Sequence, residues 1–269
     1  MSDNEMSEDE ILEDGTEPTI PADLLRTAAD PALTEDLALA LLKRADLPPG
    51  VPEQLAKNAH ALRSRKVKIA LASHPHTPRH VSVPLARQFY TFDLMKVALS
   101  PRVPADVKVA VDNALISRLK TVTVGERLTL ARRASGRVAA ALLLEVESMD
   151  GKIKDGKIIA AKINHAEAVA RRTRVMQTAL ENPRLTEALV INSVLRPVAS
   201  AALVHAVARH AKWSPRREVR AALLRTAHLS LARALEFSRE TPAGRLQELL
   251  ASSRLPTKIK DHLLRERSA

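Results

Sequence analysis

The sequence contains no cysteine, which excludes disulfide bonds, thiolate metal sites and thiol nucleophiles. Aromatic residues make up only 2% of the chain, so a core must be built from Leu, Ala, Val and Ile. No apolar run reaches the roughly 18 residues that a membrane-spanning helix requires. Residues 1–10 are acidic, whereas a signal peptide begins with a basic segment. We therefore expect a soluble, cytoplasmic protein without membrane contact.

Acidic and basic residues are divided unequally along the chain. Residues 1–17 contain eight Asp and Glu residues and no Lys or Arg. The remaining residues carry the other 23 acids and all 42 Lys and Arg residues, which gives this part a net charge of +19. A strongly basic body is typical of proteins with anionic partners. Residues 1–20 are predicted to be a disordered acidic arm, which acts either as a solubilising tail or as an internal competitor for the basic surface.

A short phrase of helix end, turn and helix start recurs along the chain. Proline disfavours helical geometry in the residue before it, so an Asx-Pro or His-Pro pair ends one helix. Thr, Ser or Pro then begins the next helix, either as a cap or as a residue without an amide hydrogen. The expected helix starts are Thr34, Pro78, Pro104, Thr186, Ser214, Ser230 and Pro256. Their intervals predict about a dozen short helices over residues 21–266 and no strands.

Two copies of this phrase carry a family resemblance: Leu71-Ala-Ser-His-Pro-His-Thr-Pro-Arg-His-Val81 and Leu180-Glu-Asn-Pro-Arg-Leu-Thr-Glu-Ala-Leu189. The phrase resembles the leucine-rich repeat variant family and, more loosely, HEAT repeats. The resemblance implies an all-α fold, a right-handed α-solenoid of short helix–turn–helix repeats, whose concave surface binds a protein or a nucleic acid. The cysteine-bound iron–sulfur cluster of one leucine-rich repeat variant protein has no equivalent here, because the chain has no cysteine.

The repeat pattern is interrupted between residues 146 and 166. Two Asp-Gly pairs, Asp150-Gly151 and Asp155-Gly156, are signals for turns. The segment lacks the regularly spaced Asp and Asn residues and the distal Glu of a calcium-binding loop. We predict a mobile insertion loop at 146–166 that divides the solenoid into an N-terminal half, residues 21–145, and a C-terminal half, residues 167–266.

Arginine and lysine residues gather near the expected helix ends. Two pairs, Arg133/Arg137 and Arg216/Arg220, have i,i+4 spacing, at which like charges on a helix repel by a few tenths of a kcal/mol. A polyanion such as the phosphates of a duplex would relieve this repulsion. The alternative is a solvated face that is partly neutralised by Glu167, Glu181, Glu187 and Glu218. The candidate polyanion-binding residues are Arg63, Arg65, Lys66, Lys68, Arg132, Arg133, Arg137, Arg171, Arg172, Arg174, Lys212, Arg216, Arg217 and Arg220.

The five aromatic residues are too few for the base-stacking platforms of single-strand-binding proteins. Phe89, Tyr90 and Phe92 lie at a helix junction, and Trp213 takes a position that is apolar in the related turns. Core packing is therefore favoured for both sites, with anchoring of a partner peptide as the alternative.

Three histidines, His74, His76 and His80, lie close together in the sequence, and the last two have a spacing that can bind zinc on a helix. However, the neighbouring prolines place His74 and His76 in a turn, and no Asp, Glu or Cys nearby completes a ligand set. The sequence also lacks a nucleophile elbow and a glycine-rich phosphate loop. We therefore predict no metal site, no cofactor and no catalytic residues.

Three functions follow from these patterns, in decreasing order of support. The first is a non-enzymatic scaffold whose curved surface binds a protein partner. The second is a basic module that contacts the phosphates of a nucleic acid duplex through its arginine clusters. The third is a HEAT-like DNA glycosylase, which the single tryptophan disfavours because those enzymes line their cleft with tryptophans and a carboxylate.

Overall fold

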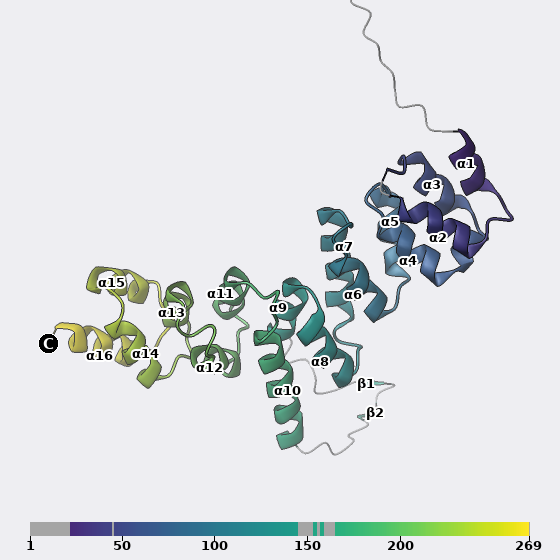
Figure 1. Cartoon of the computed structure of the whole chain (residues 1–269). Coiled ribbons are helices and arrows are strands. Elements are labelled where there is room, and N and C mark those ends of the chain that lie inside the picture. Colours follow the sequence, from purple (N-terminus) through teal and green to yellow (C-terminus); the bar gives the residue numbers. More distant parts are fainter. Residues whose placement is uncertain (1–21, 45, 145–152, 155–156, 159–164, 269) are drawn as a thin grey trace, which may run out of the picture. The chain divides into compact units, whose positions relative to one another are not determined.

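The fold of the chain is given by a computed structural model, which describes residues 22–44, 46–144, 153–154, 157–158 and 165–268 (Figure 1). The chain divides into two compact units, Met1–Ser82 and Val83–Ala269. The described residues form sixteen α-helices, one 3-10 helix and one pair of two-residue strands. The all-α class expected from the sequence is confirmed. Among the described helices, none combines the length and the apolar composition that crossing a membrane would require.

The first unit is made of short helices that pack on one another in alternation. Helix α1 contacts α3, and α2 contacts α4. Its helices are α1 (Ala22–Ala29), α2 (Glu35–Lys43), α3 (Gly50–Lys57), the 3-10 helix η1 (Ala61–Arg63), α4 (Arg65–Ala72) and the start of α5 (Arg79–Arg87). The core of this unit contains the fully buried side chains of Val51, Leu55, Val67 and Leu71.

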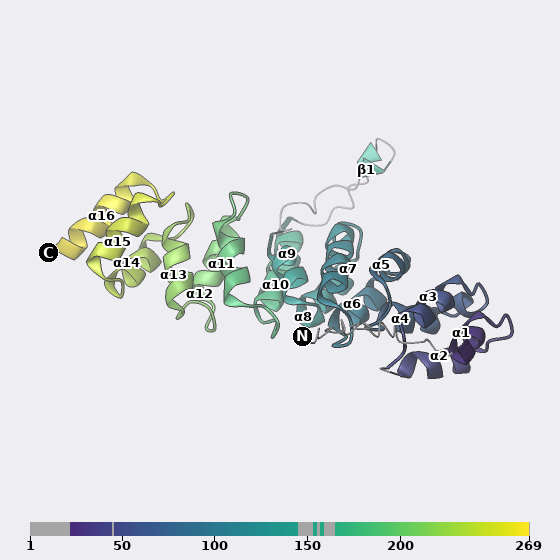
Figure 2. The same cartoon turned by 90° about the horizontal axis from the view of Figure 1, so that it is seen from above.

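The second unit has the same kind of alternating packing. Helix α9 contacts α7 and α11, and α13 contacts α11 and α15. Helices α9, α11 and α13 accordingly follow one another in chain order in both views (Figure 1 and Figure 2). The helices are α6 (Thr91–Leu99), α7 (Ala105–Arg118), α8 (Val124–Arg133), α9 (Gly136–Leu144), α10 (His165–Leu180), α11 (Glu187–Leu195), α12 (Ala201–Arg209), α13 (Arg217–Leu224), α14 (Leu231–Arg239), α15 (Ala243–Ala251) and α16 (Thr257–Ser268).

Several helix starts are set by side-chain capping, as the sequence predicted, although Ser230 precedes α14 without a capping side-chain bond. The hydroxyls of Thr34 and Thr186 accept hydrogen bonds from the amides three residues further on, which satisfies donors that have no partner inside the helix. The predicted start at Ser214 is wrong, because α13 begins at Arg217 with Arg216 as its cap. The carbonyl of Ser214 instead accepts a hydrogen bond from the side chain of Arg220, at 2.6 Å.

The described residues hold more helices than the dozen expected. Two of the extra starts follow a Thr or Ser cap that stands outside the copies of the repeated phrase. Helix α8 begins with a capping box, in which Thr123 and Glu126 each bond the backbone amide of the other. Helix α9 begins at Gly136, after Ser135. Leu, Val and Ala fill the core as expected, but no described isoleucine is fully buried.

Side chains at the helix ends link each repeat to the preceding one. The side-chain amide of Asn58 donates hydrogen bonds to the carbonyls of Ala28, at 3.0 Å, and Asp30, at 2.8 Å. Its oxygen accepts a bond from the amide of His60, at 3.1 Å. One buried side chain therefore both shapes its own turn and satisfies the end of a helix 28 to 30 residues earlier.

The same arrangement recurs at later helix ends. His74 Nε2 donates to the carbonyl of Arg44, 30 residues earlier, at 2.8 Å, while its Nδ1 accepts from the amide of His76. Asn182 and Ser253 make equivalent pairs of bonds in the second unit. We call Asn58, His74, Asn182 and Ser253 the clamp residues. All four are buried, so a polar group left without its hydrogen bond there would lower the stability of the fold. The bonds therefore fix how successive repeats pack.

The aromatic residues divide between core and surface. Trp213 is buried, and its indole nitrogen donates to the carbonyl of Leu180 at 2.8 Å. Phe89 is also buried, so core packing is confirmed for these two residues. For Tyr90 and Phe92 it is wrong, because their exposed fractions are 71% and 38%. Tyr90 occupies the N-cap position of α6 with extended backbone geometry, and its side chain makes no capping hydrogen bond.

Helices on either side of the predicted insertion pack on one another. Strands β1 (Ile153–Lys154) and β2 (Lys157–Ile158) pair antiparallel, which corrects the expectation of no strands. Helix α10, which follows the insertion, packs on α8 and α9, which precede it. The predicted Asp-Gly turns and the predicted acidic arm, residues 1–20, lie outside the described residues. The boundary between the two compact units falls between Ser82 and Val83, whereas the sequence predicted a division at residues 146–166.

Candidate anion-binding pocket

A basic pocket opens beside the end of α8 in the second unit. Its volume is about 470 Å³. The residues that line it come from α6 and its end, from the end of α8 and from the turn after α10: Met95, Lys96, Leu99, Ser100, Arg132, Arg133 and Arg184. Four of these seven residues are cationic and none is acidic. We call this site the basic pocket.

The turn after α10 brings Arg184 to this pocket. The clamp residue Asn182 donates to the carbonyls of Ala131, at 2.8 Å, and Ala134, at 3.2 Å, at the end of α8. Its oxygen accepts the amide of Arg184 at 2.8 Å. The Arg184 guanidinium in turn donates to the carbonyl of Arg133 at 3.3 Å. Arg184 is therefore held beside the arginines of α8 by a contact that spans about fifty residues of sequence.

A glycine permits this close approach. A Cβ atom on Gly136 would lie 2.2 Å from the carbonyl oxygen of Arg184 and 3.0 Å from a side-chain carbon of Leu189. Both distances are shorter than ordinary van der Waals contact. The absence of a side chain at Gly136 is therefore what lets the turn that carries Arg184 pack against the start of α9.

The charges in the basic pocket are poorly neutralised. Arg132 and Arg133 are exposed, and neither side chain makes a hydrogen bond or ion pair with the described part of the chain. The carboxylate nearest to Lys96 is that of the buried Asp93, with 4.0 Å between the charged atoms. Cations that are close together and lack acidic partners raise the electrostatic energy of the site, and an anion would lower it.

The predicted residues of the first unit lie at the start of α4 and just before it. Lys66 pairs with Glu35 on α2 at 2.8 Å. Hydrogen bonds from Lys66 and Ser64 lower the pKa of the Glu35 carboxyl, and Glu35 raises the pKa of Lys66. Arg63 and Arg65 are exposed, and Lys68 is half-buried. This cluster therefore includes a bridge between two repeats.

The predicted residues of α10 are also spread over different surroundings. Arg171 pairs with Glu167 one turn earlier on the same helix. Arg172 is half-buried, and Arg174 is exposed. Arg137 does not share a helix with Arg133, because α8 ends at Arg133 and α9 begins at residue 136. The i,i+4 repulsion expected for this pair therefore does not apply.

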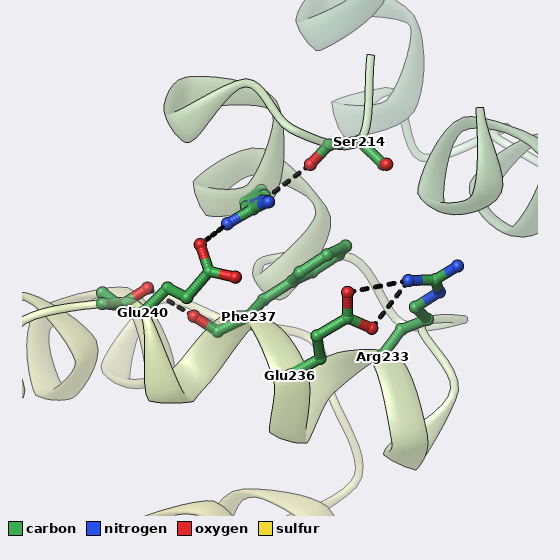
Figure 3. A network of polar contacts seen from close by, with 7 residues as sticks. Ser214, Arg233, Glu236, Phe237 and Glu240 are labelled. Atoms are coloured by element: carbon green, nitrogen blue, oxygen red, sulfur yellow. Dashed lines mark hydrogen bonds and ion pairs between the residues drawn. The ribbon is translucent and has the colours of Figure 1, made fainter. Parts of the chain in front are cut away.

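The arginines near α13 are paired with acids. Arg216 contacts Glu187 of α11 at 2.6 Å, and Arg220 pairs with Glu240 at the end of α14. Figure 3 shows Glu240 close to Phe237. The centre of the Phe237 ring lies 5.3 Å from the guanidinium carbon of Arg220. The repulsion expected at Arg216/Arg220 is therefore offset, as the alternative of a partly neutralised face anticipated.

Two further cations of this cluster do not extend the basic pocket. Lys212 lies over the ring of Trp213, with 4.3 Å between its nitrogen and the ring centre. Arg217 is exposed and lines a separate, smaller cavity. The fourteen predicted residues thus occupy several separate places, and only Arg132 and Arg133 lie in the basic pocket.

His74 and His76 bond the backbone of earlier residues, whereas His80 lies in α5. His74 is a clamp residue, and His76 Nδ1 bonds the carbonyl of Leu47 at 2.5 Å. His80 Nε2 lies 3.8 Å from a carboxylate oxygen of Glu53. Within the described ranges, no three His, Cys, Asp or Glu side chains gather in a way that could hold a metal ion.

Sequence reasoning missed Lys96 and Arg184. The only local signal was the position of Arg184 in the Asn-Pro-Arg copy of the repeated phrase, and nothing in the sequence joins that turn to α8. The contact depends on Asn182 reaching Ala131, 51 residues earlier. The chain matches no protein-family model, no curated protein and no solved structure.

Proposed function

We propose that this chain is a non-enzymatic helical-repeat scaffold that binds a protein partner, and that its repeats form a right-handed α-solenoid of the leucine-rich repeat variant or HEAT type. The repeat architecture is supported by the alternating helix packing in each unit and by clamp bonds that reach back about 30 residues. In such arrays each repeat buries its apolar face on its neighbours, so the outer helix faces are free to bind partners.

The observation that carries the proposal of a protein partner is the exposure of Tyr90 and Phe92. They lie together at the start of α6, while Phe89, Trp213 and Phe237 are buried. Exposed aromatic side chains are enriched at the centres of protein interfaces, where one such residue often contributes 2 kcal/mol or more, as an order of magnitude. Two exposed aromatics in a chain that has five mark a specific surface.

Duplex nucleic acid is the second candidate, favoured by the net charge of +19 over residues 18–269. Binding along a duplex needs cations that follow the phosphate backbone. Lys66, Arg171 and Arg216 are instead held by carboxylates, which interrupts such a track. The glycosylase alternative is the least favoured, because Trp213 is 1% exposed and its ring is not accessible to stack on an extruded base.

The test is affinity capture by the full chain, with and without nuclease, followed by binding measurements on the captured protein. We expect a protein to be captured in the presence of nuclease, and the Tyr90→Ala/Phe92→Ala variant to bind it at least about thirtyfold more weakly. The Val198→Ala variant is the matched control, because Val198 is an equally accessible apolar side chain, 62% exposed, away from α6.

The proposal fails if nuclease abolishes capture, or if the aromatic variant and the control bind the captured protein equally. If nuclease abolishes capture, titration with a DNA duplex tests the nucleic-acid candidate. A loss of affinity by orders of magnitude between low and physiological salt would then indicate phosphate contacts.

A further inference from the structure

The basic pocket differs from the cluster near α13 because its three arginines have no carboxylate partner among the described residues. Near α13, Arg216 and Arg220 each have a carboxylate of their own. In the basic pocket, Arg132 and Arg133 have none among the described residues, and Lys96 reaches only Asp93, at 4.0 Å. Asp93 is 2% exposed, and its carboxylate partly balances the charge of Lys96. The pocket therefore keeps the positive charge of Arg132, Arg133 and Arg184.

The position of Arg184 in the pocket is fixed by the fold. Arg184 is held by the bonds of the clamp residue Asn182 and by its own bond to the carbonyl of Arg133. The close approach at Gly136 leaves no room for the turn to shift towards α9. A site that is arranged before its ligand arrives loses less conformational entropy on binding. This argument applies to Arg184, whose side chain is already bonded beside Arg133.

The chemistry of the lining residues selects the ligand. Arginine guanidinium groups form two parallel hydrogen bonds to a phosphate or a carboxylate, and lysine adds a compact charge. Three arginines and a lysine are better balanced by a dianion than by a single carboxylate. The hydroxyl of Ser100 provides a further donor. Met95 and Leu99 provide apolar surface for the carbon atoms that carry the charged group.

We propose that the basic pocket binds a phosphate monoester dianion, presented by a phosphorylated serine or threonine of the protein partner. Lys96, Arg132, Arg133 and Arg184 contact the phosphate oxygens. The inference rests on the proposed function for the source of the group, whereas the recognition of the phosphate itself depends on the pocket alone. Arginine clusters of this kind are a recurrent means of recognising phosphorylated segments.

The test is calorimetric titration of the full chain at low salt with four probes. They are N-acetyl-O-phosphoserine methylamide, inorganic phosphate, N-acetylglutamate methylamide and a short DNA duplex. We expect the phosphoserine probe and phosphate to bind saturably at one site, and the glutamate probe to bind at least about tenfold more weakly. Affinity for the phosphoserine probe should fall as the pH drops below about 6, where the phosphate becomes a monoanion.

Variants separate this pocket from the other cations. Arg133→Gln/Arg184→Gln is expected to weaken phosphoserine binding at least about tenfold. Arg132→Gln tests the same charge without removing a hydrogen bond of the fold, so it remains informative if the double variant is unstable. Arg174→Gln is the matched control, an exposed arginine on α10 outside the pocket, and should bind like the wild type.

The inference is overturned if the glutamate probe binds as tightly as the phosphoserine probe, or if Arg132→Gln leaves phosphoserine affinity unchanged. It is also overturned if only the duplex binds through these residues. Phosphate binding without protein capture would refute the proposed function and leave the pocket's ligand class intact. Capture that depends on Tyr90 and Phe92 but not on phosphate would support the proposed function and overturn the inference of a phosphorylated partner.

Discussion

The basic pocket depends on Gly136, because only a residue without a side chain leaves room for the turn that carries Arg184. A Cβ there would meet the backbone carbonyl of Arg184 at 2.2 Å, and a backbone atom cannot rotate away as a flexible side chain can. Gly125 and Gly244 also lie in helices, but a Cβ added to either would meet nothing within 4 Å. Among these three glycines, only Gly136 is required by close packing.

We predict that Gly136→Ala destabilises the protein by about 3 kcal/mol, because an added methyl group in a packed region forces the backbone to move. Gly125→Ala is the control and should stabilise the protein by about 0.5 kcal/mol, since alanine loses less entropy than glycine in a helix. Denaturant unfolding of both variants measures the difference. Equal stability of the two variants would show that the turn carrying Arg184 is not tightly packed on α9.

Asp112 is a buried acid on α7. Its side chain accepts a hydrogen bond from the hydroxyl of Ser135 at 2.8 Å, and the residue is 4% exposed. Burial raises the pKa of the Asp112 carboxyl, while the Ser135 hydrogen bond and the charge of Arg137 oppose the rise. The folded state therefore binds a proton at Asp112 more readily than the unfolded state does.

The stability that Asp112 contributes is accordingly complete below its unfolded pKa, about 3.8, and is lost as the pH rises through the higher folded value. We predict that Asp112→Asn, which cannot ionise and keeps an acceptor for Ser135, is more stable than the wild type at pH 7. The advantage should disappear below about pH 3.8. Unfolding free energies measured from pH 3 to pH 7 provide the test, and an advantage independent of pH would contradict it.

At the scale of the helices, the clamp residues explain how elements distant in sequence are joined. Each one bonds its own turn and a carbonyl at the end of an earlier helix, about 30 residues back for Asn58, His74 and Ser253. For Asn182 the separation is 51 residues, because the insertion lies between the two helices. The link is therefore made between structural repeats, and its separation in sequence depends on what is inserted between them.

We predict that Asn182→Ala destabilises the second unit by about 3 kcal/mol, because it leaves the carbonyls of Ala131 and Ala134 and the amide of Arg184 without this partner. Asn113→Ala is the control. Asn113 also accepts a hydrogen bond, from Arg137, but it is exposed, so the expected cost is below about 0.5 kcal/mol. Thermal unfolding followed by circular dichroism compares the two, and similar costs would argue against a structural role for Asn182.

At the scale of the whole molecule, packing contacts are short in range. In the second unit the main contacts of each described helix are with helices one or two places away in the chain. Stability in such an array is approximately a sum of repeat and nearest-neighbour contributions. Damage at one repeat should therefore open that region first and leave distant repeats protected.

Hydrogen exchange measured by mass spectrometry tests this local cooperativity. In Asn182→Ala we expect faster amide exchange in α8 to α11 and unchanged exchange in α14 to α16. Ser253→Ala, which removes a buried bond to the carbonyl of Leu224, should give the complementary pattern, with α13, α15 and α16 affected. A uniform increase over the whole unit in either variant would indicate a single cooperative core instead of a repeat array.

The sequence by itself determined the helical class, the apolar composition of the core and many of the helix starts. These features depend on interactions between residues three or four positions apart, such as the caps at Thr34 and Thr186. Their signals can therefore be recognised in a short stretch of sequence. Burial of Trp213 could also be predicted, because the equivalent position is apolar in the related turns.

Only the tertiary structure decided which cations remain unpaired. Lys66 meets Glu35 across 31 residues and Arg216 meets Glu187 across 29, because the helices that carry them lie side by side. Arg184 joins Arg132 and Arg133 through a clamp that crosses the insertion. Counting charges along the sequence could locate clusters of cations but not their neutralisation. Coulomb energy depends on distance in space, and the folding of the repeats sets that distance.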